Sequence, residues 1–427
     1  MLSKISLLSY LKNEQVLNDY WYDCLRYELD KHIYYYGNHF RRSLEAVQES
    51  KIEKTKYIFK KVISKIKTNV SLKSIDKTKP VIISNAYFNF NEELSKLGFT
   101  VIRPPWTTDR NEWGYYHTEI VNLCVTIRSF FEQADFNYLI SREFIHILEK
   151  FSSLFKKFII EQNVRALVVP NDESFFENIS IKIFEEFNLP TFNFLHGLPT
   201  LYNSIDENRT NYLIVWGERI KEMYVASGME ESKILVSGHP KYQKIIEKPI
   251  KFSLNNILVL TKTIPGSPHS NGVILSDRGN LIVYLISIQK VLQKSGVKSV
   301  RLRPHPSENI NWYMKFLDRN FFIPDTKNLS DSLKATSLVI GPVSSVFLEA
   351  VYYQINYLVY EPVINKKNIL NRNIPKPFDG SDNRMAVAND EETLFRFLSE
   401  QKCVDPHLLT DYYKTPFDVS FMMHLIK

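Results

Sequence analysis

Glycine, cysteine and long apolar runs are all scarce in this 427-residue sequence. Only 13 residues are glycine, which excludes collagen-like and Gly-rich low-complexity chains. The three cysteines, Cys24, Cys124 and Cys403, lie far apart and form no C-x-x-C pair, so neither a zinc site nor a disulfide framework is indicated. Hydrophobic residues make up 44% of the chain, which is enough apolar material for full cores.

The missing apolar runs exclude a membrane-spanning helix. The longest ones, such as Leu281 to Ile288, are far shorter than the roughly 18–20 residues that such a helix needs. The first residues, Met1 to Lys4, lack a signal-peptide core with a small-residue cleavage site. We therefore expect a cytoplasmic protein.

The formal net charge is +7, and part of the excess lies between Lys51 and Lys79, where lysines greatly outnumber acids. One interpretation is a solvated helical face. The other is peripheral attraction to an anionic membrane or an anionic acceptor glycan, worth about 1 kcal/mol per lysine near a membrane surface. No recognised nucleic-acid module is visible, so we do not expect nucleic acid as a partner.

The pattern of apolar residues divides the chain into three parts, at 1–75, 76–248 and 249–427. The first part reads as helical, because Tyr20 to Ile63 has apolar and aromatic positions at helical spacing. In the other two parts, strand and helix patterns alternate on either side of a polar, Pro-containing linker at Glu247 to Lys251. Such alternation predicts an α/β fold with two Rossmann-like lobes of parallel strands, and a cleft between them.

The strands expected in the first lobe are Pro80–Ser84, Val101–Arg103, Ala166–Pro170, Thr191–Leu195, Tyr212–Trp216 and Ile234–Val236. Those expected in the second lobe are Ile257–Leu260, Ser299–Arg303, Phe321–Ile323, Leu338–Ile340 and Tyr357–Val359. The helices expected between them are Ile145–Gln162, Phe175–Phe187, Glu218–Ser227, Leu281–Lys294, Ser330–Ala335, Ser345–Tyr353 and Glu391–Glu400.

Ligands of parallel α/β sheets bind beyond the carboxyl ends of the strands, and the second lobe has its richest polar segments there. The segment R-L-R-P-H-P-S-E, from Arg301 to Glu308, follows one strand directly. Further along, the segment from Val339 to Ser345 ends another strand and opens a helix that has Glu349 in its first turns. A third segment, Leu258 to Ser267, ends the lobe's first strand in a loop rich in Thr, Lys, Gly and Ser, of a kind that commonly meets a phosphate.

These segments together predict a phosphate cradle without a Walker glycine loop. A helix N-terminus offers free N–H groups and the positive end of a dipole, and two serine hydroxyls add donors. His305 and the arginines supply positive charge. Read singly, the Ser-Ser pair is also a helix N-cap, and His-Pro also marks a strand end, as at His239-Pro240. The candidate nucleotide-binding residues are Thr261, Lys262, Arg303, His305, Pro306, Ser344, Ser345 and Glu349.

Two segments of the first lobe supply candidates for a general base. Asp172 and Glu173 stand at a strand end just before a helix. Either Asn171 or Asp172 caps that helix, with the acids in its first turn, or the acids face the cleft as a base. His196 follows the next strand, in a loop that Gly197 and Pro199 make tight. A lone histidine is more often structural, but this loop would present the imidazole at the cleft.

The order of these motifs resembles the GT-B glycosyltransferases of bacterial capsule and lipopolysaccharide synthesis. The order is His-Gly at His196, Trp-Gly-Glu at Trp216 and Ser-Gly-His-Pro at Ser237, followed by the His-Pro and Ser-Ser segments. Bacterial sialyltransferases and related ulosonate transferases carry a His-Pro motif and a Ser-Ser motif in the C-terminal lobe. Teichoic-acid glycerophosphotransferases share the His-Gly-x-Pro loop as well. The resemblance covers about Ala166 to Pro362.

Carried over, the resemblance implies that His305-Pro306 and Ser344-Ser345 bind the CMP part of a sugar donor in the second lobe. An acid of the first lobe, the acceptor-binding lobe, would be the base. Sialyltransferases tend to have acid-acid-Gly there, whereas Asp172-Glu173 is followed by Ser174.

The implied activity is transfer of a sialic, pseudaminic, legionaminic or Kdo-type sugar from CMP to a glycan or lipid-linked glycan acceptor at the bacterial surface. The nucleotide sugar is a substrate, and no cofactor is expected. No Asp-x-Asp occurs in the sequence, so we expect no metal requirement. Three alternatives stay open: a CDP-glycerol or UDP/GDP-sugar transferase of the same fold, an enzyme like the UDP-sugar 2-epimerases, and a non-catalytic glycan- or membrane-binding scaffold.

Overall fold

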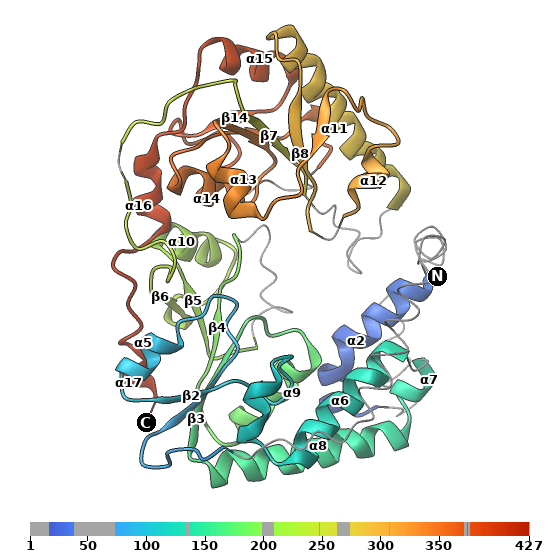
Figure 1. The fold of residues 1–427 in the computed structure, drawn as a ribbon. Helices are drawn as coiled ribbons and strands as arrows, with labels where there is room; N and C mark the ends of the chain where they lie inside the picture. The colour runs from blue at the N-terminus through green and yellow to red at the C-terminus, as the bar shows by residue number, and fades with distance from the viewer. Residues whose placement is uncertain are drawn as a thin grey trace. The chain divides into compact units, whose positions relative to one another are not determined.

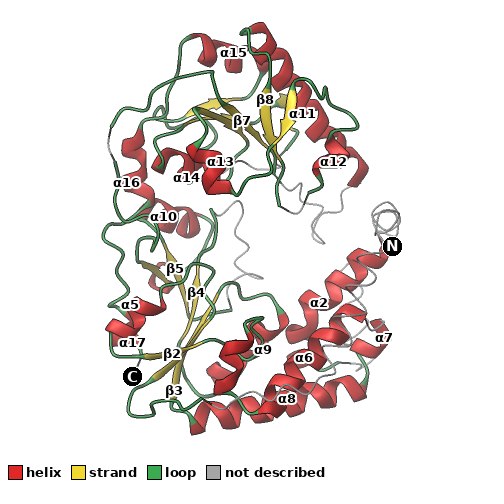
Figure 2. Ribbon diagram, in the orientation of Figure 1, coloured by secondary structure: helices red, strands yellow, loops and turns green. Residues whose placement is uncertain are grey.

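The computed structural model describes residues 17–37, 73–133, 136–198, 209–246, 248–262, 274–306, 308–370, 374 and 376–426. Within these ranges the chain forms two six-stranded parallel sheets with helices around them, as well as a small hairpin (Figures 1 and 2). The two Rossmann-like sheets expected from the sequence are therefore confirmed.

The first sheet has the strand order β2-β1-β3-β4-β5-β6. Its strands are β1 (Val81–Ser84), β2 (Thr100–Ile102), β3 (Val164–Val169), β4 (Thr191–Phe194), β5 (Tyr212–Val215) and β6 (Ile234–Val236). The central strands are nearly continuous apolar runs because helices cover both faces of the sheet. The order reverses between β1 and β3, where Ser84 lies opposite Val168.

Helices precede and separate these strands. They are α2 (Asp19–Gly37), α5 (Asn91–Lys96), η1 (Arg110–Tyr115), α6 (Thr118–Gln133), α7 (Phe136–Leu139), α8 (Arg142–Glu161), α9 (Phe175–Glu186), α10 (Glu218–Ala226) and η2 (Glu231–Lys233). In Figure 1, α8 and α9 cover one side of the first sheet, and α5 lies on the other side. The helix expected over Tyr20 to Ile63 is present as α2 as far as Gly37, and its remainder lies outside the described residues.

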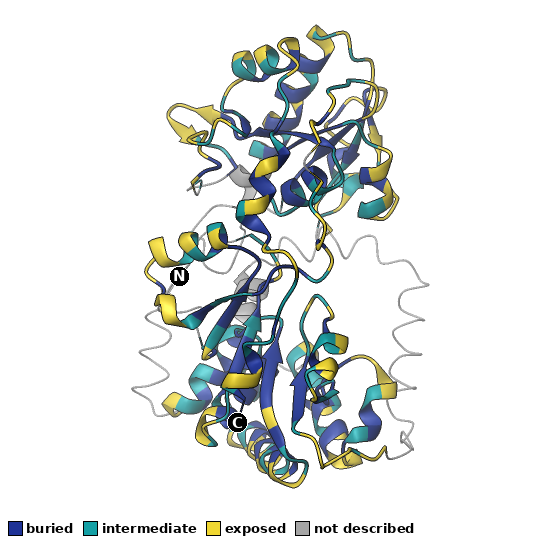
Figure 3. Ribbon diagram, turned by 90° about the vertical axis from the view of Figure 1, so that its left-hand side faces the viewer, coloured by how far each residue is buried: buried dark blue, intermediate teal, exposed yellow. Residues whose placement is uncertain are grey.

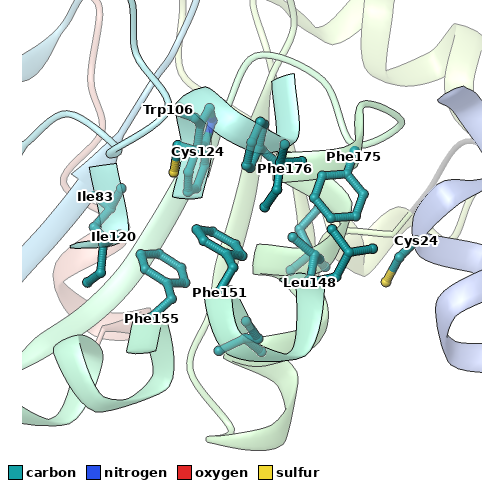
Figure 4. Packing of buried hydrophobic residues seen from close by; sticks show 14 of the residues in the cluster. Cys24, Ile83, Trp106, Ile120, Cys124, Leu148, Phe151, Phe155, Phe175 and Phe176 are labelled. Carbon is teal, nitrogen blue, oxygen red and sulfur yellow. The ribbon is translucent and has the colours of Figure 1, made fainter. Parts of the chain in front are cut away.

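Helix α8 shows how the sequence sets this packing. Ser141 caps it by accepting a hydrogen bond from the Phe144 N–H (3.2 Å). Apolar residues then recur on one face, and Phe144, Phe151 and Phe155 are fully buried. Figure 4 shows Phe151 and Phe155 close to Trp106 and Phe176, whose rings stack with centroids 5.5 Å apart. Burying each such ring stabilises the fold by roughly 1.5–3 kcal/mol.

The second sheet has the strand order β14-β11-β10-β7-β8-β9. Its strands are β7 (Ile257–Leu260), β8 (Val300–Arg303), β9 (Phe322–Pro324), β10 (Leu338–Gly341), β11 (Asn356–Tyr360) and β14 (Ala386–Ala388). Counted along the chain this is the Rossmann order 3-2-1-4-5-6, whose switch point lies between the first and fourth strands, here β7 and β10. The central strands β7, β10 and β11 are buried along their whole length, and Figure 3 draws buried residues in dark blue.

The helices of this part are α11 (Ile274–Lys294), α12 (Ile310–Tyr313), α13 (Leu329–Lys334), α14 (Val346–Tyr352), α15 (Glu391–Ser399), η3 (Pro406–Leu408), α16 (Leu409–Tyr412) and α17 (Met422–Leu425). The hairpin is β12 (Val363–Ile364) and β13 (Lys367–Asn368). Strand β14 and the hairpin were missed in the sequence. Both are short, and the alternating pattern of β14 consists of only three small residues.

The chain divides into two compact units that differ from the expected lobes at their edges. The first unit is Met1–Phe194, Ile205–Ile214 and Val419–Lys427, and the second is Leu195–Ser204 and Val215–Asp418. The second unit therefore includes β6, α10 and His196. The expected boundaries at residues 75 and 248 stay predictions.

Candidate functional site

The strand order puts the candidate site of the second unit at the carboxyl ends of β7, β8 and β10. The segments after these strands carry Thr261, His305 and Ser344, respectively. Ligands of such sheets bind outside the carboxyl ends of the strands at the switch point. The structure therefore brings the separate sequence motifs to one edge of one sheet.

The end of β7 and the His305 loop are joined by hydrogen bonds. The Thr261 N–H donates to the Arg303 carbonyl (3.3 Å), and the His305 N–H donates to Thr261 Oγ1 (3.2 Å). The Thr261 hydroxyl in turn donates to the Glu308 carboxylate (2.5 Å). His305 is exposed, yet partial burial of its ring lowers its pKa below 6.5, while the Glu308 charge acts in the opposite direction.

The two arginines of β8 are held by a buried aspartate. Asp325 follows β9, and its side chain is only 1% exposed. Its carboxylate pairs with Arg301 (2.7 Å) and with Arg303 (3.0 Å), and Arg303 also donates to the Lys327 carbonyl (2.5 Å). The two arginines, which we expected to bind a phosphate, therefore already share the negative charge of Asp325. The role of Arg303 toward a nucleotide stays a prediction.

Hydrogen bonds to the side chains of Glu361 and Tyr357 hold the loop after β10 in place. Glu361 is fully buried, and its Oε1 accepts a hydrogen bond from the Val343 N–H (2.7 Å). The Tyr357 hydroxyl donates to the Pro342 carbonyl (2.7 Å). A Cβ at Gly341 would come within 2.3 Å of that hydroxyl oxygen, so only glycine fits at this position.

The Ser-Ser pair begins α14, which has only seven residues. Ser345 is the N-cap residue, but its side chain makes no capping hydrogen bond. Ser344 Oγ accepts a hydrogen bond from the Val346 N–H (3.3 Å), and both serines are partly exposed. The capping interpretation therefore holds for Ser344 and not for Ser345.

Lys262 and Glu349 each interact with a group of opposite charge. Burial lowers the pKa of Lys262, and the negative charge of Glu361 opposes that effect. Glu349 forms an ion pair with Lys241 (2.7 Å), in the segment after β6. Glu349, expected at the nucleotide, is thus engaged in joining α14 to that segment.

Asp172 is the more deeply buried of the two adjacent acids in the first unit. It is 4% exposed, and its Oδ2 accepts a hydrogen bond from the Arg209 backbone N–H (2.8 Å). Burial raises its pKa to about 6, although Arg209 opposes the shift. Asn171 Oδ1 accepts from the N–H groups of Glu173 (3.2 Å) and Ser174 (3.0 Å), which precede α9, and the N-cap residue Ser174 makes no side-chain capping hydrogen bond. Neither Asn171 nor Asp172 therefore caps α9 with its side chain.

A second buried acid of this unit was missed in the sequence. Glu177 of α9 is 6% exposed, and burial raises its pKa despite a hydrogen bond from the Trp106 indole (3.0 Å). Asn85, at the end of β1, also hydrogen-bonds this carboxyl. The only signal in the sequence is an acid inside the apolar run from Phe175 to Ile181, which reads as an ordinary helical position.

The two histidines that follow strands of the first sheet have opposite environments. His196, after β4, is exposed. His239, after β6, is fully buried among the rings of Trp216, Tyr242 and Tyr413. Burial, reinforced by the Lys241 charge, lowers the pKa of His239 to about 3, so this imidazole is neutral. His239 is therefore a core residue, as the simpler interpretation of its His-Pro pair has it.

The remaining expectations concern the membrane and metal ions. No helix in the described ranges is long and apolar enough to cross a membrane. In the same ranges, no three His, Cys, Asp or Glu side chains group in a way that could hold a metal ion. The basic stretch from Lys51 to Lys67 lies outside the described residues, so membrane contact stays a prediction.

No family model matches the sequence, and no curated protein matches it either. Solved structures are similar at low identity. The UDP-GlcNAc 2-epimerase from Neisseria meningitidis bound to UDP-GlcNAc is 12% identical, with 81% of this chain and 98% of that chain covered and a TM-score of 0.42. The lipopolysaccharide outer core galactosyltransferase WaaB is 11% identical, with 81% and 98% covered and a TM-score of 0.45.

The wall teichoic acid polymerase TagF is 12% identical, with 64% of this chain and 82% of that chain covered and a TM-score of 0.33. Likenesses at this level are too distant to carry a function. A function must therefore be argued from the residues at the strand ends.

Proposed function

We propose that the chain is a GT-B glycosyltransferase that transfers a nonulosonic or ulosonic acid sugar from a CMP-activated donor to a bacterial surface glycan. The observation that carries the proposal is the meeting of three polar segments at the switch point of the second sheet. These segments follow β7, β8 and β10 and carry Lys262, His305 and the Ser344-Ser345 pair. The sequence resemblance supplies the choice of CMP.

In this proposal the second unit holds the nucleotide. Departure of CMP leaves an oxocarbenium-like centre on the sugar and negative charge on the phosphate. Donors fixed before the reaction lower the barrier because they need no reorganisation as that charge develops. His305 and the hydroxyls of Ser344 and Ser345 would meet the phosphate, and Lys262 would add positive charge. The hydrogen bonds from the His305 and Val343 N–H groups keep the two loops in fixed conformations.

A residue that follows a strand of the first sheet would supply the base. A carboxylate whose pKa is about 6 is ionised at neutral pH and is still basic enough to accept a proton from an attacking hydroxyl. This favours Asp172 over its neighbour Glu173, which is only partly buried. His196 is the second candidate, because it is exposed in the loop after β4.

The proposal is tested first by thermal shift with CMP, CDP, UDP and GDP. A ligand that binds only the folded state raises the melting temperature. We expect CMP to give the largest shift, and release of CMP from a CMP-linked nonulosonic acid to show turnover.

Protection by CDP alone would favour glycerophosphate transfer, and protection by UDP alone would favour a UDP-sugar transferase or an epimerase. Absence of protection by every nucleotide, together with no donor turnover, would leave the non-catalytic scaffold.

A further inference from the structure

The carboxylate of Glu308, at the edge of the second sheet, has no role that the sequence alone predicts. Glu308 Oε2 accepts hydrogen bonds from the Thr261 hydroxyl (2.5 Å) and from the His305 N–H (3.2 Å). Its Oε1 accepts a third from the Tyr313 hydroxyl (2.7 Å), and its own N–H donates to the His305 carbonyl (2.8 Å). Glu308 therefore connects the end of β7, the His305 loop and α12.

These contacts decide which donors remain for a ligand. A threonine hydroxyl has one proton, and Thr261 directs it at Glu308. Thr261 can then offer a phosphate no hydrogen bond, and its oxygen instead accepts the His305 N–H. The expectation that Thr261 binds phosphate directly does not fit this arrangement. Thr261 is better understood as a link between Glu308 and the His305 loop.

The charge of Glu308 also acts on the His305 ring. Partial burial lowers the pKa of His305, and the Glu308 carboxylate raises it again. Lys262 follows β7, and Arg303 of the neighbouring strand β8 has its guanidinium paired with Asp325. Among the described residues, Glu308 is thus a group that favours a protonated imidazole.

We propose that Glu308 is a positioning residue of the nucleotide site, which fixes the His305 loop against the end of β7 and keeps its imidazole able to take up a proton when a phosphate binds. The proposal rests on the proposed function, since it makes the donor phosphate the partner of His305. An imidazolium gives a phosphate a charge-assisted hydrogen bond, which is stronger than one from a neutral ring.

The test compares wild-type protein with Glu308→Gln, which keeps the shape of the side chain and removes its charge. NMR titration without nucleotide follows the His305 resonance, identified by its loss in His305→Ala. Calorimetry measures CMP affinity on both sides of the His305 pKa. In Glu308→Gln we expect a lower His305 pKa and a loss of CMP affinity, largest on the acidic side and on the order of tenfold.

Two further variants keep the test decisive. Glu308→Asp retains the charge and should recover part of the affinity. Tyr313→Phe removes one hydrogen bond to the carboxylate but leaves its charge, so it should weaken CMP binding slightly by loosening the loop without lowering the His305 pKa. The matched control is Glu391→Gln, which removes an acid from a surface pair with Lys290 in the same unit. It should change neither the titration nor the affinity.

An unchanged His305 titration in Glu308→Gln would overturn the proposal, even if the melting temperature fell, because it would leave Glu308 a purely structural role. An unchanged CMP affinity would overturn it as well. If the wild-type protein binds no nucleotide, the proposed function fails instead, and the titration alone still decides whether Glu308 controls the protonation of His305.

Discussion

Replacing Asp172 by asparagine should separate its chemical role from its structural cost. Burial raises the pKa of Asp172 from 3.8 to about 6, so the folded protein holds this proton more tightly than the unfolded chain does. Protonated Asp172 therefore contributes its full stabilisation at a pH below 3.8, the pKa in the unfolded chain. That contribution is lost as the pH rises through about 6, the pKa in the folded protein. A shift of about two pKa units corresponds to about 3 kcal/mol.

Asparagine has no charge to desolvate, and its side-chain oxygen can still accept the Arg209 N–H hydrogen bond. The stability of Asp172→Asn relative to wild type should therefore improve with pH. About half of the 3 kcal/mol, roughly 1.4 kcal/mol, falls between about pH 5 and about pH 8. Urea unfolding of both proteins at several pH values measures this difference.

The turnover rate of Asp172→Asn should fall, although its stability relative to wild type improves with pH. If Asp172 is the base, the asparagine variant loses roughly 10²–10⁴-fold in rate while it keeps its fold. Glu173→Gln and His196→Ala serve as matched variants at the other two candidates. The reasoning about burial is refuted if the stability difference between wild type and Asp172→Asn does not change with pH. Normal turnover in all three variants would show that the base lies elsewhere.

Three other changes test the packing and charge described above. Gly341→Ala should cost about 1–3 kcal/mol in urea unfolding, because its methyl group would force the buried Tyr357 to move; an unchanged free energy would contradict this contact. Asp325→Ala should cost about 3 kcal/mol or more by the same assay, since it leaves Arg301 and Arg303 without the carboxylate that pairs with both. Glutamine at the lysines from Lys51 to Lys67 should reduce co-sedimentation with anionic vesicles at low salt, and equal binding to neutral vesicles would leave only a solvated face.

The two sheets could be predicted from the sequence because their central strands, such as β1, β7, β10 and β11, are buried on both faces. Such strands are short continuous apolar runs, and every expected strand is found with its ends moved by no more than two residues. Strand β14 and the hairpin have no such run. Helix α6 was not predicted either, although its 16 residues include buried apolar positions such as Ile120 and Ile127.

The residues of the candidate site could be named from the sequence, but their hydrogen-bond partners could not. Asp325 reaches Arg303 because β9 lies beside β8, and Glu361 reaches Val343 because β11 lies beside β10. Strand order sets these pairs, and no local pattern encodes it. The pKa of Asp172 likewise depends on Arg209, which stands 37 positions away in the chain.

The most direct test of the central claim is CMP binding by the second unit's strand ends. Calorimetry on the full chain should show CMP binding to wild type, and a loss of about tenfold or more in His305→Ala and in the double change of Ser344 and Ser345 to alanine. Ser399→Ala, an exposed serine on α15, is the matched control and should bind like wild type. Equal CMP affinity in wild type and both site variants, with melting temperatures unchanged, would contradict the assignment of the nucleotide site.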